Sequence, residues 1–263
     1  MKPVLALFAL LALGSPASAA LTPADVGAVR AASSPNARAP LDLPFRDDAG
    51  RPTTLRAALG GKVGLLVFAD YTCSSLCGLA LVLTKAGLEA SGLAPGRDYR
   101  LAVVGLNPKD GPAAAEAMRR QRLGDDLAID RATSFLIGDA AAVRRATAAM
   151  GYHYAYDAAH DQYAHPAVAY VLRSDGRVAS VTPEIGLAGP ALKAALIAAR
   201  TEAPAPSNGV AAGLHLLCYG FDPAHGLYNG ATIAALRWGA LGLFGIGALV
   251  LARVAFRRRE SVK

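Results

Sequence analysis

One continuous apolar run and one largely apolar run, joined by a stretch with helical spacing, constrain the fold of this chain most. The runs are Val63–Ala69 (VGLLVFA) and Tyr99–Leu106 (YRLAVVGL). The first run has no charged residue and the second has only Arg100 near its start; apolar segments with β-branched residues are typical of central strands that are buried on both faces. Between them, Ser75–Ser91 carries leucines near one helical stripe and ends before Pro95-Gly96. A strand, a helix and a second strand in this order predict a βαβ unit, and therefore an α/β fold.

The rest of the pattern extends this unit. Helices and strands alternate up to residue 150, the segment GYHYAYD alternates like an edge or hairpin strand, and a Ser-Asp-Gly turn marks a β-hairpin. A central βαβ unit followed by a ββα unit predicts a thioredoxin-like fold, with a central mixed sheet flanked by helices. The further elements that we expect are a pair of short extended pieces around Asp47–Gly50, helices at Gly111–Leu123, Asp139–Met150 and Gly189–Arg200, and strands at Thr133–Ile137, Ala167–Leu172 and Arg177–Val181.

The amino-terminal segment has the pattern of a secretory signal peptide. Lys2 is followed by the apolar run Val4–Leu13 and by the small residues Ala17-Ser18-Ala19. We interpret residues 1–20 as a cleaved signal peptide, with an uncleaved anchor as the alternative. Residues 21–40 are rich in Ala, Ser and Pro and are expected to form a flexible leader to the domain at residues 41–202.

A second apolar stretch lies near the other end. Trp238–Ala252 contains no charge, but alone it would span only about 22 Å as a helix. If the flanking arginines extend toward the membrane surfaces, residues 231–256 are long enough for a transmembrane helix. Because the basic tail at residues 257–263 favours the cytoplasmic side, we expect a single-pass protein of the cytoplasmic (inner) membrane, with its domain in the periplasm. Residues 203–230 would form a linker and a juxtamembrane segment.

The distribution of charge and the absence of certain motifs argue against nucleic acids and nucleotides as ligands. The formal net charge is +7, but part of it lies in the terminal segments and the remainder is scattered. No basic block is interleaved with aromatic residues, so we expect no nucleic-acid partner. No GxGxxG or P-loop motif points to nucleotides.

Cys73 and Cys77 stand where chemistry is expected in an α/β sheet. They follow a buried strand and lead into a helix, at the carboxyl end of the strand, where ligands gather. A helix amino terminus favours thiolates, and a spacing of four residues places two sulfurs on one helix face. Two thiolates with one further ligand would suit Cu(I). A structural disulfide remains an alternative, although a bridge across so short a loop would stabilise the fold weakly.

A histidine is the natural third ligand, and His165 has the best position. It immediately precedes the strand Ala167–Leu172, which we expect to pair beside the strand that leads to Cys73. His160, in the preceding loop, is the spare candidate. His153 lies in the alternating segment and is interpreted as an ordinary strand residue.

Three segments resemble the Sco/SenC family of copper-binding, thioredoxin-like proteins. They are FRDDAGRPTTLRAALGGKVGLLVFADYTCSSLC, VVGLNPKDGP and DQYAHPAVAYVLRSDGRVAS, within residues 43–200. The resemblance implies that copper is bound by Cys73, Cys77 and His165, and that the chain assembles the binuclear copper site of cytochrome c oxidase or serves another cuproprotein. The tail, with LLCYGFDPAHGLYNG, resembles a membrane-anchored bacterial subgroup.

The chain departs from the family pattern at three positions. Ser74 and Gly78 stand where many members have proline, and Asn107 replaces an aspartate, while Asp110 is retained. The loss of a carboxylate near a metal site removes a hydrogen-bond acceptor and a negative charge.

The third cysteine, Cys218, lies three residues after His215. It is interpreted as a buried apolar residue before the membrane, with a reactive thiol or a second metal contact involving His215 or His225 as the alternative.

Three functions are compatible with this pattern. The first is a metallochaperone that binds copper through the thiolates and the imidazole. The second is a thiol–disulfide oxidoreductase, in which Cys73 and Cys77 are redox thiols that reduce the cysteines of a cuproprotein partner. A peroxidase of the same broad fold ranks last, because no basic partner is evident near the thiol.

Overall fold

The computed structural model describes residues 21–34, 37–73, 77–124, 127–184 and 187–202, together with 221–222, 227–228 and 238. Residues 1–219 and 220–263 form two units. In the second unit, the short strands β12 (Phe221–Asp222) and β13 (Leu227–Tyr228) pair antiparallel.

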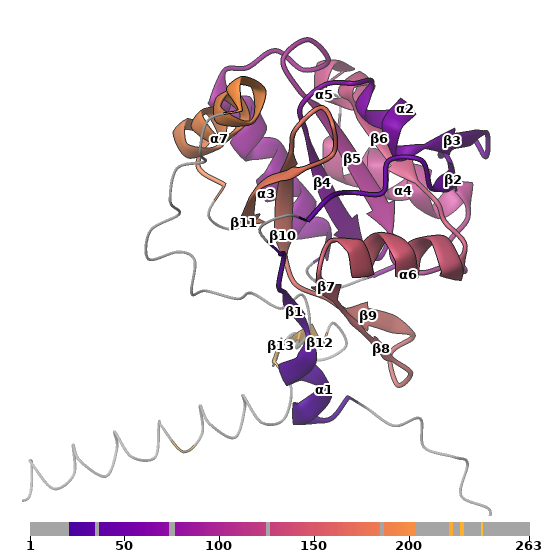
Figure 1. The fold of residues 1–263 in the computed structure, drawn as a ribbon. Helices are drawn as coiled ribbons and strands as arrows, with labels where there is room; N and C mark the ends of the chain where they lie inside the picture. The colour runs from indigo at the N-terminus through magenta and orange to yellow at the C-terminus, as the bar shows by residue number, and fades with distance from the viewer. Residues whose placement is uncertain are drawn as a thin grey trace, which may run out of the picture. The chain divides into compact units, whose positions relative to one another are not determined.

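A five-stranded mixed sheet forms the centre of the first unit (Figure 1). Its strands β4, β5 and β6 run parallel, β10 pairs antiparallel with β4, and β11 pairs antiparallel with β10. This confirms the predicted α/β fold with a central mixed sheet and the pairing of the hairpin beside β4. Across the sheet, the order is β11 (Val178–Pro183), β10 (Val168–Leu172), β4 (Gly64–Ala69), β5 (Arg100–Gly105) and β6 (Thr133–Leu136).

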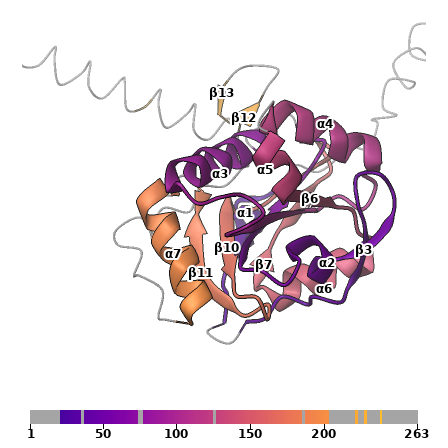
Figure 2. The same cartoon turned by 90° about the horizontal axis from the view of Figure 1, so that it is seen from above.

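Helices cover both faces of the sheet, as Figure 2 shows from above. One face carries α3 (Cys77–Ser91), α4 (Pro112–Leu123), α5 (Leu127–Ala132) and α7 (Gly189–Thr201), and the other carries α2 (Leu55–Leu59) and α6 (Ala140–Ala149). Side chains that alternate along β4 supply the two cores, which explains why the whole strand is apolar. Leu65 and Val67 face the first set of helices, while Leu66 and Phe68 face the second.

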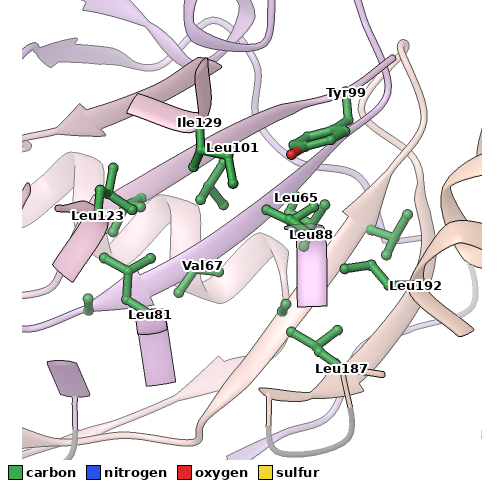
Figure 3. Packing of buried hydrophobic residues seen from close by; sticks show 14 of the residues in the cluster. Leu65, Val67, Leu81, Leu88, Tyr99, Leu101, Leu123, Ile129, Leu187 and Leu192 are labelled. Carbon is green, nitrogen blue, oxygen red and sulfur yellow. The ribbon is translucent and has the colours of Figure 1, made fainter. Parts of the chain in front are cut away.

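The first core fixes the helix that begins at Cys77. Leu81 and Leu88 of α3 pack against Leu65 and Val67 of β4, and Leu192 of α7 closes the cluster (Figure 3). Leu65, Leu81 and Leu88 are completely buried. Burying a leucine side chain contributes about 1.5–3 kcal/mol, so these contacts hold the start of α3 firmly at the end of β4.

Smaller elements surround the sheet. The segment GYHYAYD does not form one strand, because β7 pairs with β1 while β8 pairs with β9. The stretch expected as a leader contains α1 and β1, and the backbone of Ala39 bonds to Gly176 in the turn between β10 and β11. These elements are α1 (Pro23–Ala28), β1 (Arg30–Ala31), β2 (Pro44–Arg46), β3 (Pro52–Thr54), β7 (Tyr152–His153), β8 (Ala155–Asp157) and β9 (Gln162–Ala164).

Within the described part of the chain, no helix is both long enough and apolar enough to cross a bilayer. The predicted signal peptide at residues 1–20 lies outside that part. So does the predicted span at 231–256, apart from residue 238.

Candidate functional site

The candidate site lies at the carboxyl end of β4. The strand ends at Ala69, and a turn follows in which the N–H of Cys73 donates to the carbonyl of Asp70 at 3.2 Å. The Cys73 side chain is buried and α3 begins at Cys77, so the segment lies between a buried strand and a helix, as predicted. Residues 74–76 and the side chain of Cys77 lie outside the described residues.

Two buried carboxylates hold this turn. Asp110 accepts from the N–H of Tyr71 at 3.1 Å. The hydroxyl of Thr72 lies 3.1 Å from Asp70 Oδ1 and 3.2 Å from Asp110 Oδ1. A hydroxyl has one proton, so it donates to one of these carboxylates at a time. Burial and the negative charge of Asp70 raise the pKa of Asp110 to about 6.

The β8–β9 hairpin is attached to the same turn. The N–H of Tyr163 donates to Asp70 Oδ2 at 2.9 Å, and the thiol of Cys73 lies 3.5 Å from the side-chain oxygen of Gln162. Gln162 and Tyr163 belong to β9, three and two residues before His165. Asp70 thus connects the cysteine turn to the segment that carries the histidine.

His165 is almost fully buried, and its contacts favour one tautomer. The hydroxyl of Tyr152 donates to the carbonyl of Pro166 at 2.8 Å, and its oxygen lies 2.8 Å from Nδ1 of His165. Nδ1 also lies 3.3 Å from the same carbonyl. The carbonyl of Pro166 can only accept, so all of these contacts are satisfied together when Tyr152 donates to Pro166 and Nδ1 donates to Tyr152, and this arrangement leaves the ring's lone pair on Nε2. A histidine that ligates a metal is held in this way.

Glu184 lies near His165 on the other side of the hairpin. Its N–H donates to the carbonyl of Ala167 at 3.0 Å, and its side chain is buried. Burial raises the pKa of Glu184 to about 8, while attraction to a charged His165 lowers it. Glu184 therefore holds its proton at neutral pH and adds no negative charge beside the imidazole.

The structure brings two of the three predicted ligands to one edge of the sheet. Cys73 and His165 are joined through Asp70 and Gln162, as described above. Among the described residues, no three His, Cys, Asp or Glu side chains lie close enough to hold a metal ion. Because the Cys77 side chain is outside that set, the three-residue ligand set stays a prediction.

The other histidines and the third cysteine take no described part in this site. His160 is about half exposed and bonds to Asp157 at 2.6 Å. His153 is exposed in β7. Cys218, His215 and His225 lie outside the described residues.

Sequence reasoning missed Asp70, Tyr152, Gln162 and Glu184. Asp70 carried a signal, because a carboxylate directly after a buried strand must find hydrogen bonds. The other three reach the site only through pairing between strands.

No protein-family model and no curated protein matches the chain. Among solved structures, it is similar to a protein from Aquifex aeolicus VF5 described as a candidate electron transfer protein. The TM-score is 0.53 and the identity 18%, over 64% of this chain and 99% of that protein. The chain shares that protein's fold.

Sco/SenC proteins are also among the solved structures that this chain resembles. Copper-bound ScoI of Bradyrhizobium japonicum matches with a TM-score of 0.48 and 21% identity, over 65% of this chain and 100% of that one. A Sco1/SenC family lipoprotein of Bacillus anthracis matches with a TM-score of 0.46 and 17% identity, over 59% and 90%.

Proposed function

We propose that this chain is a Sco/SenC-type copper protein, which binds copper through Cys73, Cys77 and His165 and delivers it to a cuproprotein. The observation that carries the proposal is the hydrogen-bonded link between the Cys73 turn and the segment that bears His165. This link is a feature of the chain's own structure and does not depend on similarity to any other protein. The three motif segments and the α/β fold agree with it.

The donor atoms fit copper. Thiolate sulfur and imidazole nitrogen are ligands that suit Cu(I), and the tautomer that the contact with Tyr152 favours leaves the lone pair of His165 on Nε2, the ring nitrogen on the other side from that contact. Copper bound here would be cargo, passed on by exchange of its ligands for those of a partner. The chain's own residues orient the donors: Tyr152 fixes the ring, and Asp70 fixes the turn.

Burial gives the site a second property. Cys73 is 7% exposed and His165 is 1% exposed, so little water reaches either donor. A dry site protects thiolates and a cuprous ion from oxidation in the compartment outside the membrane. A cytochrome c oxidase subunit with a binuclear copper site is the partner class that the family resemblance implies.

The membrane attachment is part of this proposal. Residues 1–20 would direct export, and residues 231–256 would hold the domain at the periplasmic face of the cytoplasmic membrane. Such a tether keeps a copper carrier close to a membrane-bound oxidase. Protease protection of the tail in sealed spheroplasts tests this orientation.

A copper titration with two histidine variants tests the proposed function. The full-length chain should bind one Cu(I), and His165→Ala should weaken its affinity by at least tenfold. His153→Ala, which removes an exposed histidine from β7, should have no effect. If His165→Ala binds copper as the wild type does while disulfide exchange persists, the chain is a thiol–disulfide oxidoreductase of Cys73 and Cys77 instead.

A further inference from the structure

A half-exposed imidazole lies on the hairpin that contacts Cys73. Nδ1 of His160 lies 2.6 Å from Oδ2 of Asp157, whose side chain is completely buried, while the imidazole itself is 48% exposed. Oδ1 of the same carboxylate accepts from the N–H of Ala159 at 3.0 Å. An ionised carboxylate can only accept hydrogen bonds, so Nδ1 carries the hydrogen of this pair, and a neutral ring then has its lone pair on Nε2. Because the Nδ1 edge faces the buried carboxylate, the exposed part of the ring lies away from that edge.

The same face of the hairpin reaches the thiol of Cys73. Asp157 of β8 pairs with Gln162 of β9. Residues directly opposite each other in an antiparallel pair project their side chains from one face, with their Cβ atoms about 4.5–5.5 Å apart. The side-chain oxygen of Gln162 lies 3.5 Å from Sγ of Cys73, and the carboxylate of Asp157 holds His160. Two facing side chains therefore connect the exposed imidazole with the buried thiol.

The tip of the hairpin also has contacts with a second element. Asp161, next to His160, has a φ of 46°, a backbone conformation that residues other than glycine rarely adopt. Its carboxylate accepts from the hydroxyl of Tyr156 at 2.6 Å and from the ammonium of Lys109 at 3.2 Å. Lys109 lies in the loop between β5 and α4, which also supplies Asp110 to the cysteine turn. A strained residue that is held at a fixed tip is a feature of functional sites.

We propose that His160 is a copper ligand at the entrance of the buried site, through which the ion passes on its way in and out. The inference rests on the proposed function for the identity of the cargo. Imidazole nitrogen suits copper, and a histidine that ligates a metal donates its other N–H to a carboxylate, as His160 does. An exposed ligand serves this site because Cys73 is 7% exposed and His165 is 1% exposed, so an ion in solution has little access to either donor.

The transfer is an exchange of ligands, without a change in the oxidation state of copper. The lone pair of Nε2 forms a bond to the ion while a ligand of the donor molecule still holds it, and the bond to that ligand then breaks. In the next exchange, a buried donor forms a bond to the ion and the bond to Nε2 breaks. His160 is neutral before and after each exchange, so neither a proton nor an electron moves at this residue.

A Cu(II) titration of the chain without thiols tests the exposed ligand by itself. In the full-length chain with every cysteine replaced by serine, Cu(II) should broaden the ring signals of His160 in nuclear magnetic resonance spectra at lower concentrations than those of His153, which is exposed in β7. Asp157→Asn should raise the concentration needed at His160 by about tenfold. Equal broadening of the two histidines would overturn the proposal, and this comparison holds even if Asp157→Asn unfolds the hairpin. A folded Asp157→Asn variant with unchanged broadening of His160 would also overturn it.

Transfer kinetics with the native cysteines test the route. Cu(I) is supplied to the full-length chain as its bicinchoninate complex and then withdrawn by excess chelator, and both rates are followed by stopped-flow absorbance. His160→Ala should slow uptake and release alike, by about tenfold if the rates follow the affinity of the entrance ligand, whereas His153→Ala should slow neither. A change that merely loosened the hairpin would speed release, so unchanged or faster release in His160→Ala rejects the route. If the wild type takes up no Cu(I), the proposed function fails, and the Cu(II) titration alone decides whether His160 binds copper.

Discussion

The hydroxyl of Tyr152 should matter both to the stability of this protein and to the orientation of His165. It accepts from Nδ1 of His165 and donates to the carbonyl of Pro166, both at 2.8 Å. Tyr152→Phe removes this oxygen alone, because the ring stays packed against Phe68, with 4.5 Å between the ring centroids. The substitution therefore isolates the polar contacts.

Two buried polar groups lose a partner in this variant. An unsatisfied buried donor or acceptor costs about 1–3 kcal/mol. Nδ1 keeps its longer contact of 3.3 Å with Pro166, which offsets part of the loss. We therefore expect the free energy of unfolding to fall by about 2–4 kcal/mol. Because the ring is then held only by the longer contact with Pro166, copper affinity should fall by roughly 10- to 100-fold.

Urea unfolding of the metal-free protein, followed by circular dichroism, measures the first quantity, and Cu(I) competition measures the second. Tyr170→Phe is the matched control. Its buried hydroxyl donates to the carbonyl of Met150 at 3.2 Å and makes no contact with His165. The control should lose about 1 kcal/mol and retain its copper affinity. If the two variants match in both quantities, Tyr152 does not orient the histidine.

Two more predictions concern the carboxylates below the cysteine turn. The raised pKa of Asp110, about 6, means that the folded state binds this proton more tightly than the unfolded chain, so its contribution to stability is present below pH 4 and is lost as the pH rises through 6. As the pH rises from 4 to 7, the free energy of unfolding of Asp110→Asn should therefore increase relative to that of the wild type by about 1–3 kcal/mol. Urea unfolding at several pH values measures this change. A difference between the two proteins that does not vary with pH would contradict the prediction. Thr72→Val should lower the free energy of unfolding by about 1–3 kcal/mol, because Asp70 and Asp110 lose their shared donor. Thr72→Ser keeps the hydroxyl and should lower the free energy of unfolding by less than about 1 kcal/mol. Equal melting temperatures of the two variants would show that the hydroxyl is not needed.

The sheet was predictable because its strands carry their own signal. Val63–Ala69 is apolar throughout since β4 is covered on both faces, and the pairing of β10 beside β4 is confirmed. The short helices α2 and α5 escaped prediction, because five or six residues show too little periodicity. β9 also escaped, since Gln162–Ala164 has no β-rich run of its own and pairs only because β8 lies beside it.

The only part of the candidate site that could be predicted is the pair of residues that lie at the ends of neighbouring strands. Cys73 and His165 could be placed together from the expected order of strands. Tyr152 and Glu184 could not, because their positions depend on the β7 pairing and on the register that sets Val168 opposite Pro183.

X-ray absorption at the copper edge of the Cu(I)-loaded full-length chain tests the central claim most directly. The account predicts one copper with two sulfur ligands and one imidazole nitrogen, and the loss of that nitrogen in His165→Ala. A spectrum with sulfur ligands alone, or one that His165→Ala leaves unchanged, would contradict it.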